Sequence, residues 1–224
     1  MINILYEDNH LIAVNKKSGD LVQGDKTGDK PLSEFVKKYI KKKYHKTGKV
    51  FLGTIHRLDR PTSGIVLFAK TSKALSRMNK QFKNQEVQKN YWAIVNNPPP
   101  NNSGTLVNML KKNTQKNKSY ITNNKNGKNA ILDYKVIKKL KNYYMLEIQP
   151  KTGRHHQIRV QLANIGCPIK GDLKYGAKRS NKDASINLHA YQLFFLHPVK
   201  KEKICITAET PKNPIWNIKN KKYN

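Results

Sequence analysis

A lone carboxylate lies among basic residues in segment 56–64. The segment reads His-Arg-Leu-Asp-Arg-Pro-Thr-Ser-Gly, so Asp59 has Arg57 and Arg60 close on either side and His56 shortly before it. Positive neighbours keep a carboxylate ionised, as a nucleophile or general base requires, and the same arginines can bind phosphate groups. Taken alone, however, Asp59 also fits a surface ion pair, which is the commoner role for an isolated aspartate.

Two more segments place reactive side chains at the edge of an apolar element. Segment 89–91 (Lys-Asn-Tyr) opens a predicted strand, and segment 153–159 (Gly-Arg-His-His-Gln-Ile-Arg) leads into a predicted helix. We expect Arg154 to lie near the N-terminus of this helix, an end that attracts anions. Alternatives stay open for each segment: Tyr91 could simply pack in its strand, and Arg159 could make a surface phosphate contact or a structural salt bridge.

The elements around these segments would hold them rigidly. Residues 45–64 lack periodicity and contain three glycines and a proline, which predicts a loop, whereas the run Ile-Val-Leu-Phe-Ala at 65–69 is typical of a buried strand. Asp59 would therefore lie at the tip of a loop that leads into the core. A second strand is predicted at 91–95, and apolar residues at helical spacing predict a helix that ends at Gly166.

The rest of the chain predicts many strands with a few interspersed helices. Segment 111–129 is rich in Lys and Asn, has a predicted hairpin tip at Asn126-Gly127, and fits either a mobile or an RNA-facing role. Because strands and helices do not alternate regularly, we expect an α+β fold. The other predicted elements are a hairpin of 3–6 and 11–14, an amphipathic helix from Pro31, a helix capped by Ser72, and strands at 131–136, 143–148, 188–196 and 204–208.

The composition favours a polyanionic partner. The 224 residues include 44 Lys+Arg against 14 Asp+Glu, which gives a formal net charge of +30. Such a charge concentrates RNA or DNA near the protein and accelerates encounter. An AT-rich coding bias, visible in the abundance of Lys, Asn and Ile, accounts for part of the excess. The length and the 37% of hydrophobic residues fit one domain over residues 1–224.

Several other classes of protein lack support. The two cysteines, Cys167 and Cys205, form no Cys-x-x-Cys motif, and no apolar run approaches the ~18 residues of a membrane span. A zinc nucleobase deaminase would need a His-x-Glu and a Pro-Cys-x-x-Cys motif, and neither occurs. His155 and His156 are adjacent instead of four residues apart, so we interpret them as RNA-contacting or structural residues. We expect a cytoplasmic protein without a metal site.

Several segments in order resemble the RluA-like RNA pseudouridine synthases. The resemblance runs from Asn3 nearly to the end of the chain. It rests on His-Arg-Leu-Asp-x-x-Thr-Ser-Gly at 56–64, Lys-x-Tyr at 89–91, Gly-Arg-x-His-Gln-Ile-Arg-Val at 153–160, Gly-Cys-Pro-Ile-Lys-Gly-Asp at 166–172, Tyr-Gly at 175–176, Leu-His-Ala at 188–190 and His-Pro at 197–198.

The resemblance implies a role for each matching residue. Asp59 would be the essential aspartate, which attacks the uridine or promotes detachment of its base. Tyr91 would lie against the target base, Arg159 would pair with Asp59, and Arg57 would enter the space that the flipped nucleotide leaves. Neither a metal nor an organic cofactor is implied. The expected RNA-binding residues are His56, Arg57, Arg60, Lys89, Arg154 and Gln157.

The resemblance also implies the fold and the substrate class. We expect a pseudouridine synthase fold, with a mixed, mostly antiparallel sheet flanked by helices and loops. The chain would be a monomer without the family's optional N-terminal S4 domain, and it would act on uridines in structured ribosomal or transfer RNA. The alternative is a non-catalytic RNA-binding or ribosome-assembly module on the same fold. Asp59 discriminates between them, since a pure binding module would be free to lose it.

Overall fold

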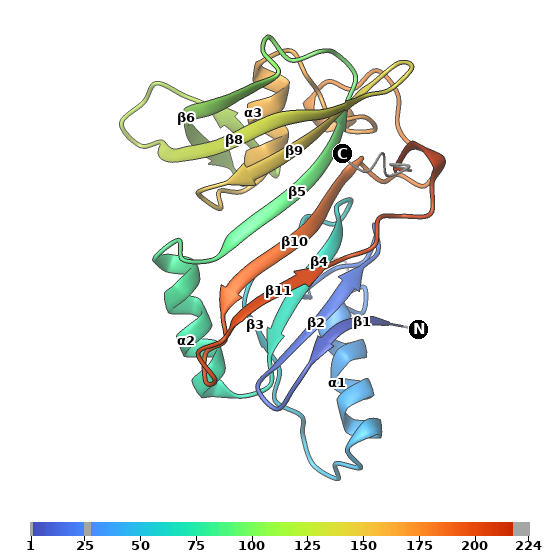
Figure 1. The fold of residues 1–224 in the computed structure, drawn as a ribbon, viewed down its shortest axis with the longest axis vertical. Helices are drawn as coiled ribbons and strands as arrows, with labels where there is room; N and C mark the ends of the chain where they lie inside the picture. Colours follow the sequence, from blue (N-terminus) through green and yellow to red (C-terminus); the bar gives the residue numbers. More distant parts are fainter. Residues whose placement is uncertain (1, 25–27, 217–224) are drawn as a thin grey trace, which may run out of the picture.

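The strands of the computed structural model, which describes residues 2–24 and 28–216, join in one sheet (Figure 1). They follow the order β1-β2-β4-β10-β5-β9-β8-β6-β7, with β3 paired to β4 and β11 to β10. Strands β4 and β10 run parallel, and the other described neighbours are antiparallel. The strands are β1 (Asn3–Glu7), β2 (Leu11–Lys16), β3 (Gly53–Thr54), β4 (Ser63–Ala69), β5 (Gln88–Val95), β6 (Ser103–Asn113), β7 (Lys118–Ile121), β8 (Lys128–Lys139), β9 (Tyr144–Pro150), β10 (Leu188–Leu196) and β11 (Lys203–Thr207).

Strand β4 is buried on both faces because each face carries a helix. Ile65 and Leu67 pack in one core with Ala74 and Met78 of α2 (Ser72–Lys83). The intervening Val66 and Phe68 pack in another core with Leu32, Val36 and Ile40 of α1 (Leu32–Lys43). Successive side chains of a strand point to opposite faces, so both sets must be apolar. The apolar run at 65–69 is therefore uninterrupted because its side chains pack alternately into two separate cores.

A third helix covers the other half of the sheet. Ile158 and Leu162 of α3 (Gln157–Asn164) pack against Leu132 of β8 and Leu146 of β9. In Figure 1 this half, formed by β5, β9, β8, β6 and β7, lies above the half that carries α1 and α2. The short 3-10 helices η1 (Leu173–Tyr175) and η2 (Pro214–Trp216) complete the described elements.

The two halves of the sheet meet where β10 pairs with β5, and β10 touches β4 only where β4 begins. Only Ser63 and Gly64 of β4 pair with β10, opposite His189 and Ala190. Gly64 has a φ of +113°, and a Cβ atom there would collide with the backbone of Ala190. A glycine is thus required at the close approach of the two strands. This contact brings the loop that precedes β4 beside β10 and β5.

The α+β class and the mixed, mostly antiparallel sheet agree with the sequence expectation, as do the opening hairpin and the three helices. Three details of the prediction were wrong. The segment 45–64 is not all loop, since it contains β3 and the start of β4. The α2 cap is Thr71, whose side chain accepts a hydrogen bond from the Ala74 amide at 3.2 Å, instead of Ser72. A turn, not a hairpin tip, contains Asn126-Gly127, because β7 and β8 both pair with β6.

Strand β6 was not predicted, and it changes the interpretation of segment 111–129. The segment supplies the end of β6, all of β7 and the start of β8, so half of its Lys and Asn residues lie in strands. The turn at 114–117 is the true tip of the β6–β7 hairpin. Across 2–24 and 28–216, no helix is long and apolar enough to cross a membrane.

Candidate active site

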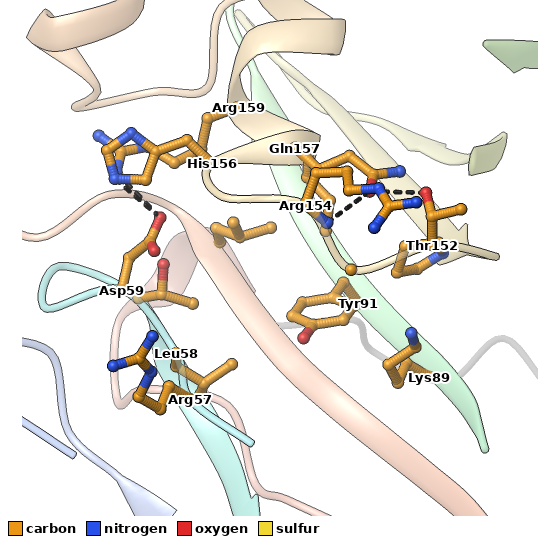
Figure 2. A pocket seen from close by; sticks show the side chains of 15 residues that line it. Arg57, Leu58, Asp59, Lys89, Tyr91, Thr152, Arg154, His156, Gln157 and Arg159 are labelled. Atoms are coloured by element: carbon orange, nitrogen blue, oxygen red, sulfur yellow. Dashed lines mark hydrogen bonds and ion pairs between the residues drawn. The ribbon is translucent and has the colours of Figure 1, made fainter. Parts of the chain in front are cut away.

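The segments 56–64, 89–91 and 153–159, which carry the predicted site residues, meet around one pocket of about 130 Å³ (Figure 2). The loop before β4 forms one wall, the start of β5 and the end of β9 form the next, and the approach to α3 closes the site. The lining residues are Arg57, Leu58, Asp59, Thr62, Lys89, Tyr91, Pro150, Thr152, Gly153, Arg154, His156, Gln157, Ile158, Arg159 and Leu188.

Asp59 is held by a buried guanidinium that a second carboxylate fixes in turn. Arg159 Nη1 lies 3.0 Å from Asp59 Oδ2, while its Nε and Nη2 donate to the two carboxylate oxygens of Asp172 at 2.7 and 2.8 Å. Burial lowers the pKa of Arg159, but the ion pairs with Asp172 and Asp59 outweigh that effect and raise it. The guanidinium therefore stays charged. Within the described residues, Asp59 Oδ1 has no hydrogen-bond or ion-pair partner, which leaves one oxygen for chemistry.

His156 is the other neighbour of Asp59. Its Nε2 lies 3.6 Å from Asp59 Oδ2, and its Nδ1 lies 2.9 Å from the Tyr175 hydroxyl. Burial, followed by the charge of Arg159, lowers the pKa of His156 to about 2. The imidazole is thus neutral, and the contact with Asp59 is not an ion pair. His156 has a φ of +54° just before α3, a left-handed conformation that turns its ring back toward the pocket.

Tyr91 also lines the pocket and lies to the right of Asp59 and below Arg154 in Figure 2. Burial and the charge of Asp59 raise its pKa above the ordinary value, so the phenol is protonated at neutral pH. No hydrogen bond to the hydroxyl occurs in the part of the chain that the structure describes. An aromatic ring that carries a free hydroxyl can pack against a planar base and form a hydrogen bond with it.

Three of the predicted RNA-binding residues line the pocket with basic groups. Arg57 is exposed at its rim, and burial lowers the pKa of Lys89 in the wall. Arg154 was predicted at the start of a helix, which is wrong because α3 begins only at Gln157. Its Nε instead donates to the Asn129 carbonyl at 2.8 Å, so β8 fixes the position of the side chain.

Gln157 also lines the pocket, yet its amide is engaged within the protein. Its Oε1 accepts hydrogen bonds from the Thr152 hydroxyl at 2.8 Å and the Arg154 amide at 2.9 Å, and its Nε2 donates to the Ile131 carbonyl at 3.0 Å. The side chain therefore closes the loop that leads from β9 into α3. Contact of Gln157 with RNA stays a prediction.

His56 and Arg60 do not line the pocket. His56 Nε2 accepts a hydrogen bond from the Leu67 amide at 3.2 Å, its ring stacks on Phe82, and burial lowers its pKa to about 4. Arg60 Nη2 lies 2.8 Å from Asp29 Oδ2. These contacts position the two ends of the loop around Asp59, and RNA binding by either residue stays a prediction.

Sequence reasoning assigned no role to Asp172, Tyr175 or Lys16, all of which support the site. Asp172 and Tyr175 belong to motifs that carried the resemblance, so their presence was noted but their partners were not. Lys16 is 1% exposed, and its Nζ donates to the carbonyls of Lys17 at 2.8 Å and Arg60 at 3.0 Å. Burial lowers the pKa of Lys16 to about 8. The described residues contain no group of three or more His, Cys, Asp or Glu side chains that could hold a metal.

Comparison with known proteins places this site in a family. Residues 10–164 match the family model described as RNA pseudouridylate synthase. The chain is 36% identical over 214 residues to ribosomal large subunit pseudouridine synthase C of Buchnera aphidicola subsp. Schizaphis graminum, covering 92% of this chain and 66% of that protein. It is 34% identical over 235 residues to tRNA pseudouridine synthase C of Vibrio vulnificus, covering 96% and 93%.

A solved structure has the same fold. Human RNA pseudouridylate synthase domain containing 4 superposes with a TM-score of 0.78 at 24% identity, over 94% of this chain and 89% of that one. The chain spans just under two thirds of the length of some of its relatives, such as the Buchnera protein. With the predicted motifs, the family match and the fold in agreement, the chain belongs to the RluA-like RNA pseudouridylate synthase family.

Proposed function

We propose that this chain converts specific uridines of structured RNA to pseudouridine, with Asp59 as the catalytic carboxylate. The observation that carries the proposal is the chain of contacts from Asp172 through Arg159 to Asp59, which fixes one carboxylate at a pocket and leaves one of its oxygens without a partner among the described residues. Such a carboxylate can attack the uridine directly or promote detachment of the base. In either case the N-glycosidic bond breaks, the uracil turns, C5 bonds to the ribose and loses its proton, and N1 gains one.

The other side chains would divide the remaining tasks. Tyr91 packs against the base and can relay a proton, while Arg159 orients Asp59. Removing a base from an RNA stack costs a few kcal/mol. Arg57, exposed at the pocket rim, would occupy the vacated space with a planar, charged group that can both stack and donate hydrogen bonds.

The proposed substrates are ribosomal or transfer RNA, as in the names of the related proteins. The net charge of +30 supports a polyanionic substrate of either kind. RNA shape around the target uridine would decide which sites are modified. We further propose that the chain acts as a monomer in the cytoplasm and binds RNA through this catalytic domain.

The test combines mapping with one substitution. Pseudouridine mapping of total RNA with and without the gene should reveal sites that depend on it. Those sites should be modified in vitro by the purified chain and not by Asp59→Asn, which nearly preserves shape but removes the ionised oxygen. The matched control is Asp183→Asn, since that carboxylate is exposed and accepts hydrogen bonds from nearby Ser185, outside the pocket.

The RNA affinity of the Asp59→Asn chain distinguishes a catalytic role of Asp59 from a structural one. Asp59→Asn should bind RNA as tightly as the unchanged chain, or slightly better, because the lost charge repels phosphates. Appreciable single-turnover pseudouridine formation by Asp59→Asn, after excluding deamidation back to aspartate, would refute the assignment. A fall in melting temperature with a matching fall in RNA affinity would instead identify Asp59 as a structural ion-pair partner.

A further inference from the structure

A second cavity adjoins the candidate active site, in the fork where β5 and β9 separate. The strands are paired from Tyr91 and Ile148 onward, but the first residues of β5 pair with β10 while the end of β9 pairs with β8. The fork opens toward the left of Figure 1, below β9. It encloses about 380 Å³, a volume typical of small-molecule sites, and shares Lys89 and Pro150 with the catalytic pocket.

Three glutamines line this cavity with unused amides. Across the described ranges, the side chains of Gln85, Gln88 and Gln149 make no hydrogen bond. Each amide offers both a carbonyl acceptor and two N–H donors. Gln85 lies just before β5, Gln88 opens that strand, and Gln149 lies near the end of β9, so the lining glutamines come from both sides of the fork.

The charged side chains of the same cavity are mostly engaged elsewhere. Lys151 Nζ lies 2.9 Å from Asp133 Oδ2, and Glu86 Oε1 accepts a hydrogen bond from the side-chain amide of Asn84 at 2.9 Å. Among the described residues, the polar groups of the lining without a partner are therefore the three neutral amides and one carboxylate oxygen of Glu86, with Lys89 as the cation at the boundary with the catalytic pocket. A purely anionic ligand would be better served by lysines or arginines than by glutamines.

A nucleobase fits this chemistry. Its edge presents donors and acceptors side by side, and glutamine amides can pair with such an edge in bidentate fashion. A cation between two base-sized cavities also lies where the phosphodiester that joins two successive nucleotides would pass. We propose that the fork is a nucleobase subsite that receives the nucleotide next to the target uridine and selects it through Gln85, Gln88 and Gln149. This inference rests on the proposed function, because it requires a target uridine in the neighbouring pocket.

The test uses a pool of RNA hairpins, each with one loop uridine between randomised neighbours. Pseudouridine formation by the purified chain is sequenced for every member of the pool, and binding is measured separately with the Asp59→Asn chain. The subsite variant is the triple change Gln85→Ala, Gln88→Ala and Gln149→Ala. The control is Gln192→Ala, a glutamine of β10 that donates to Thr207 and does not line either cavity.

The unchanged chain and the control should prefer one base at one neighbouring position by about 10-fold or more, as expected for a bidentate amide contact. The triple variant should keep its melting temperature and lose the preference in both turnover and binding. A folded triple variant that keeps the full preference, or an unchanged chain without any preference, would overturn the subsite. If binding shows the preference but no pseudouridine forms in any RNA, the subsite stands and the proposed function fails.

Discussion

Arg159 is shared by two carboxylates, and this sharing explains how Asp59 is kept in place. Asp172 occupies two nitrogens of the guanidinium in a planar, bidentate arrangement, and Asp59 takes a third. Bidentate pairing fixes direction as well as distance, which a lysine at this position would not provide. We therefore expect Asp172 to act on the proposed reaction through Arg159, as a positioning residue.

We predict that Asp172→Asn lowers the single-turnover rate and destabilises the fold by roughly 3 kcal/mol, because it leaves a buried guanidinium with one carboxylate instead of two. Urea unfolding and single-turnover pseudouridine formation measure the two effects. Asp183→Asn serves again as the exposed control. A variant with unchanged rate and unchanged stability would show that Asp172 does not position Arg159.

At the scale of elements, the β6–β7 hairpin is docked against the active site through Tyr175. The Tyr175 hydroxyl accepts a hydrogen bond from the Ser119 amide at 2.8 Å and lies 2.9 Å from His156 Nδ1. Ser119 Oγ in turn lies 2.9 Å from His155 Nδ1. The hairpin and the residues before α3 are therefore held by one buried hydrogen-bond network.

We expect Tyr175→Phe to loosen this docking, since it leaves the buried Ser119 amide without its acceptor at a cost of about 1–3 kcal/mol. Hydrogen exchange at Ser119 should accelerate, while exchange in β4 should not change. Tyr120→Phe is the matched control on the same strand, because Tyr120 is exposed. Equal exchange at Ser119 in both variants would contradict the proposed role of the hydroxyl.

A second network ties α1 to the edge of the sheet through Glu7. Its carboxylate accepts hydrogen bonds from Lys43, Lys70, Tyr39 and Tyr44 at 2.7–3.0 Å. Burial raises the pKa of Glu7, but these four donors outweigh it and lower the pKa from 4.5 to about 2. Because the folded state binds this proton more weakly than the unfolded state, the stabilisation is present above pH 4.5 and is lost as the pH falls toward 2.

Glu7→Gln should therefore be less stable than the unchanged chain at pH 7, by up to roughly 3 kcal/mol, and this difference should shrink as the pH falls below about 4. Denaturant unfolding at several pH values measures it. Glu34→Gln on α1, whose carboxylate pairs with Lys37 at the surface, should cost much less at every pH. A Glu7→Gln difference that stays constant with pH would contradict the network.

At the scale of the whole molecule, the excess of 30 positive charges should dominate RNA affinity. We predict that the log of the RNA association constant falls linearly with the log of salt concentration, with a slope of about 0.7–0.9 per neutralised phosphate. Binding of the Asp59→Asn chain to a target RNA, titrated with salt, avoids turnover during the measurement. A nearly flat dependence would show that the charge is incidental to binding.

The sequence alone determined the fold class and most strands and helices, and its resemblance to a family predicted Asp59, Tyr91 and Arg159 as the central residues. Apolar periodicity is a local property that follows from which faces of an element are buried, so it can be read without the neighbouring elements. The location of Asp59 in a loop before a buried strand could be predicted for the same reason, since the burial of that strand is visible in the run at 65–69.

Only the tertiary structure decided how these elements act together. The resemblance implied the pairing of Arg159 with Asp59, and the structure confirms this contact between residues 100 positions apart. Its support by Asp172 was not predicted, because it depends on how the segment after α3 returns to the site. Packing also decides the left-handed conformation of His156, after which α3 begins later than the sequence pattern predicts. Strand register likewise decides where β5 and β9 separate to form the fork. Such contacts depend on long-range geometry, which the local pattern of residue types does not encode.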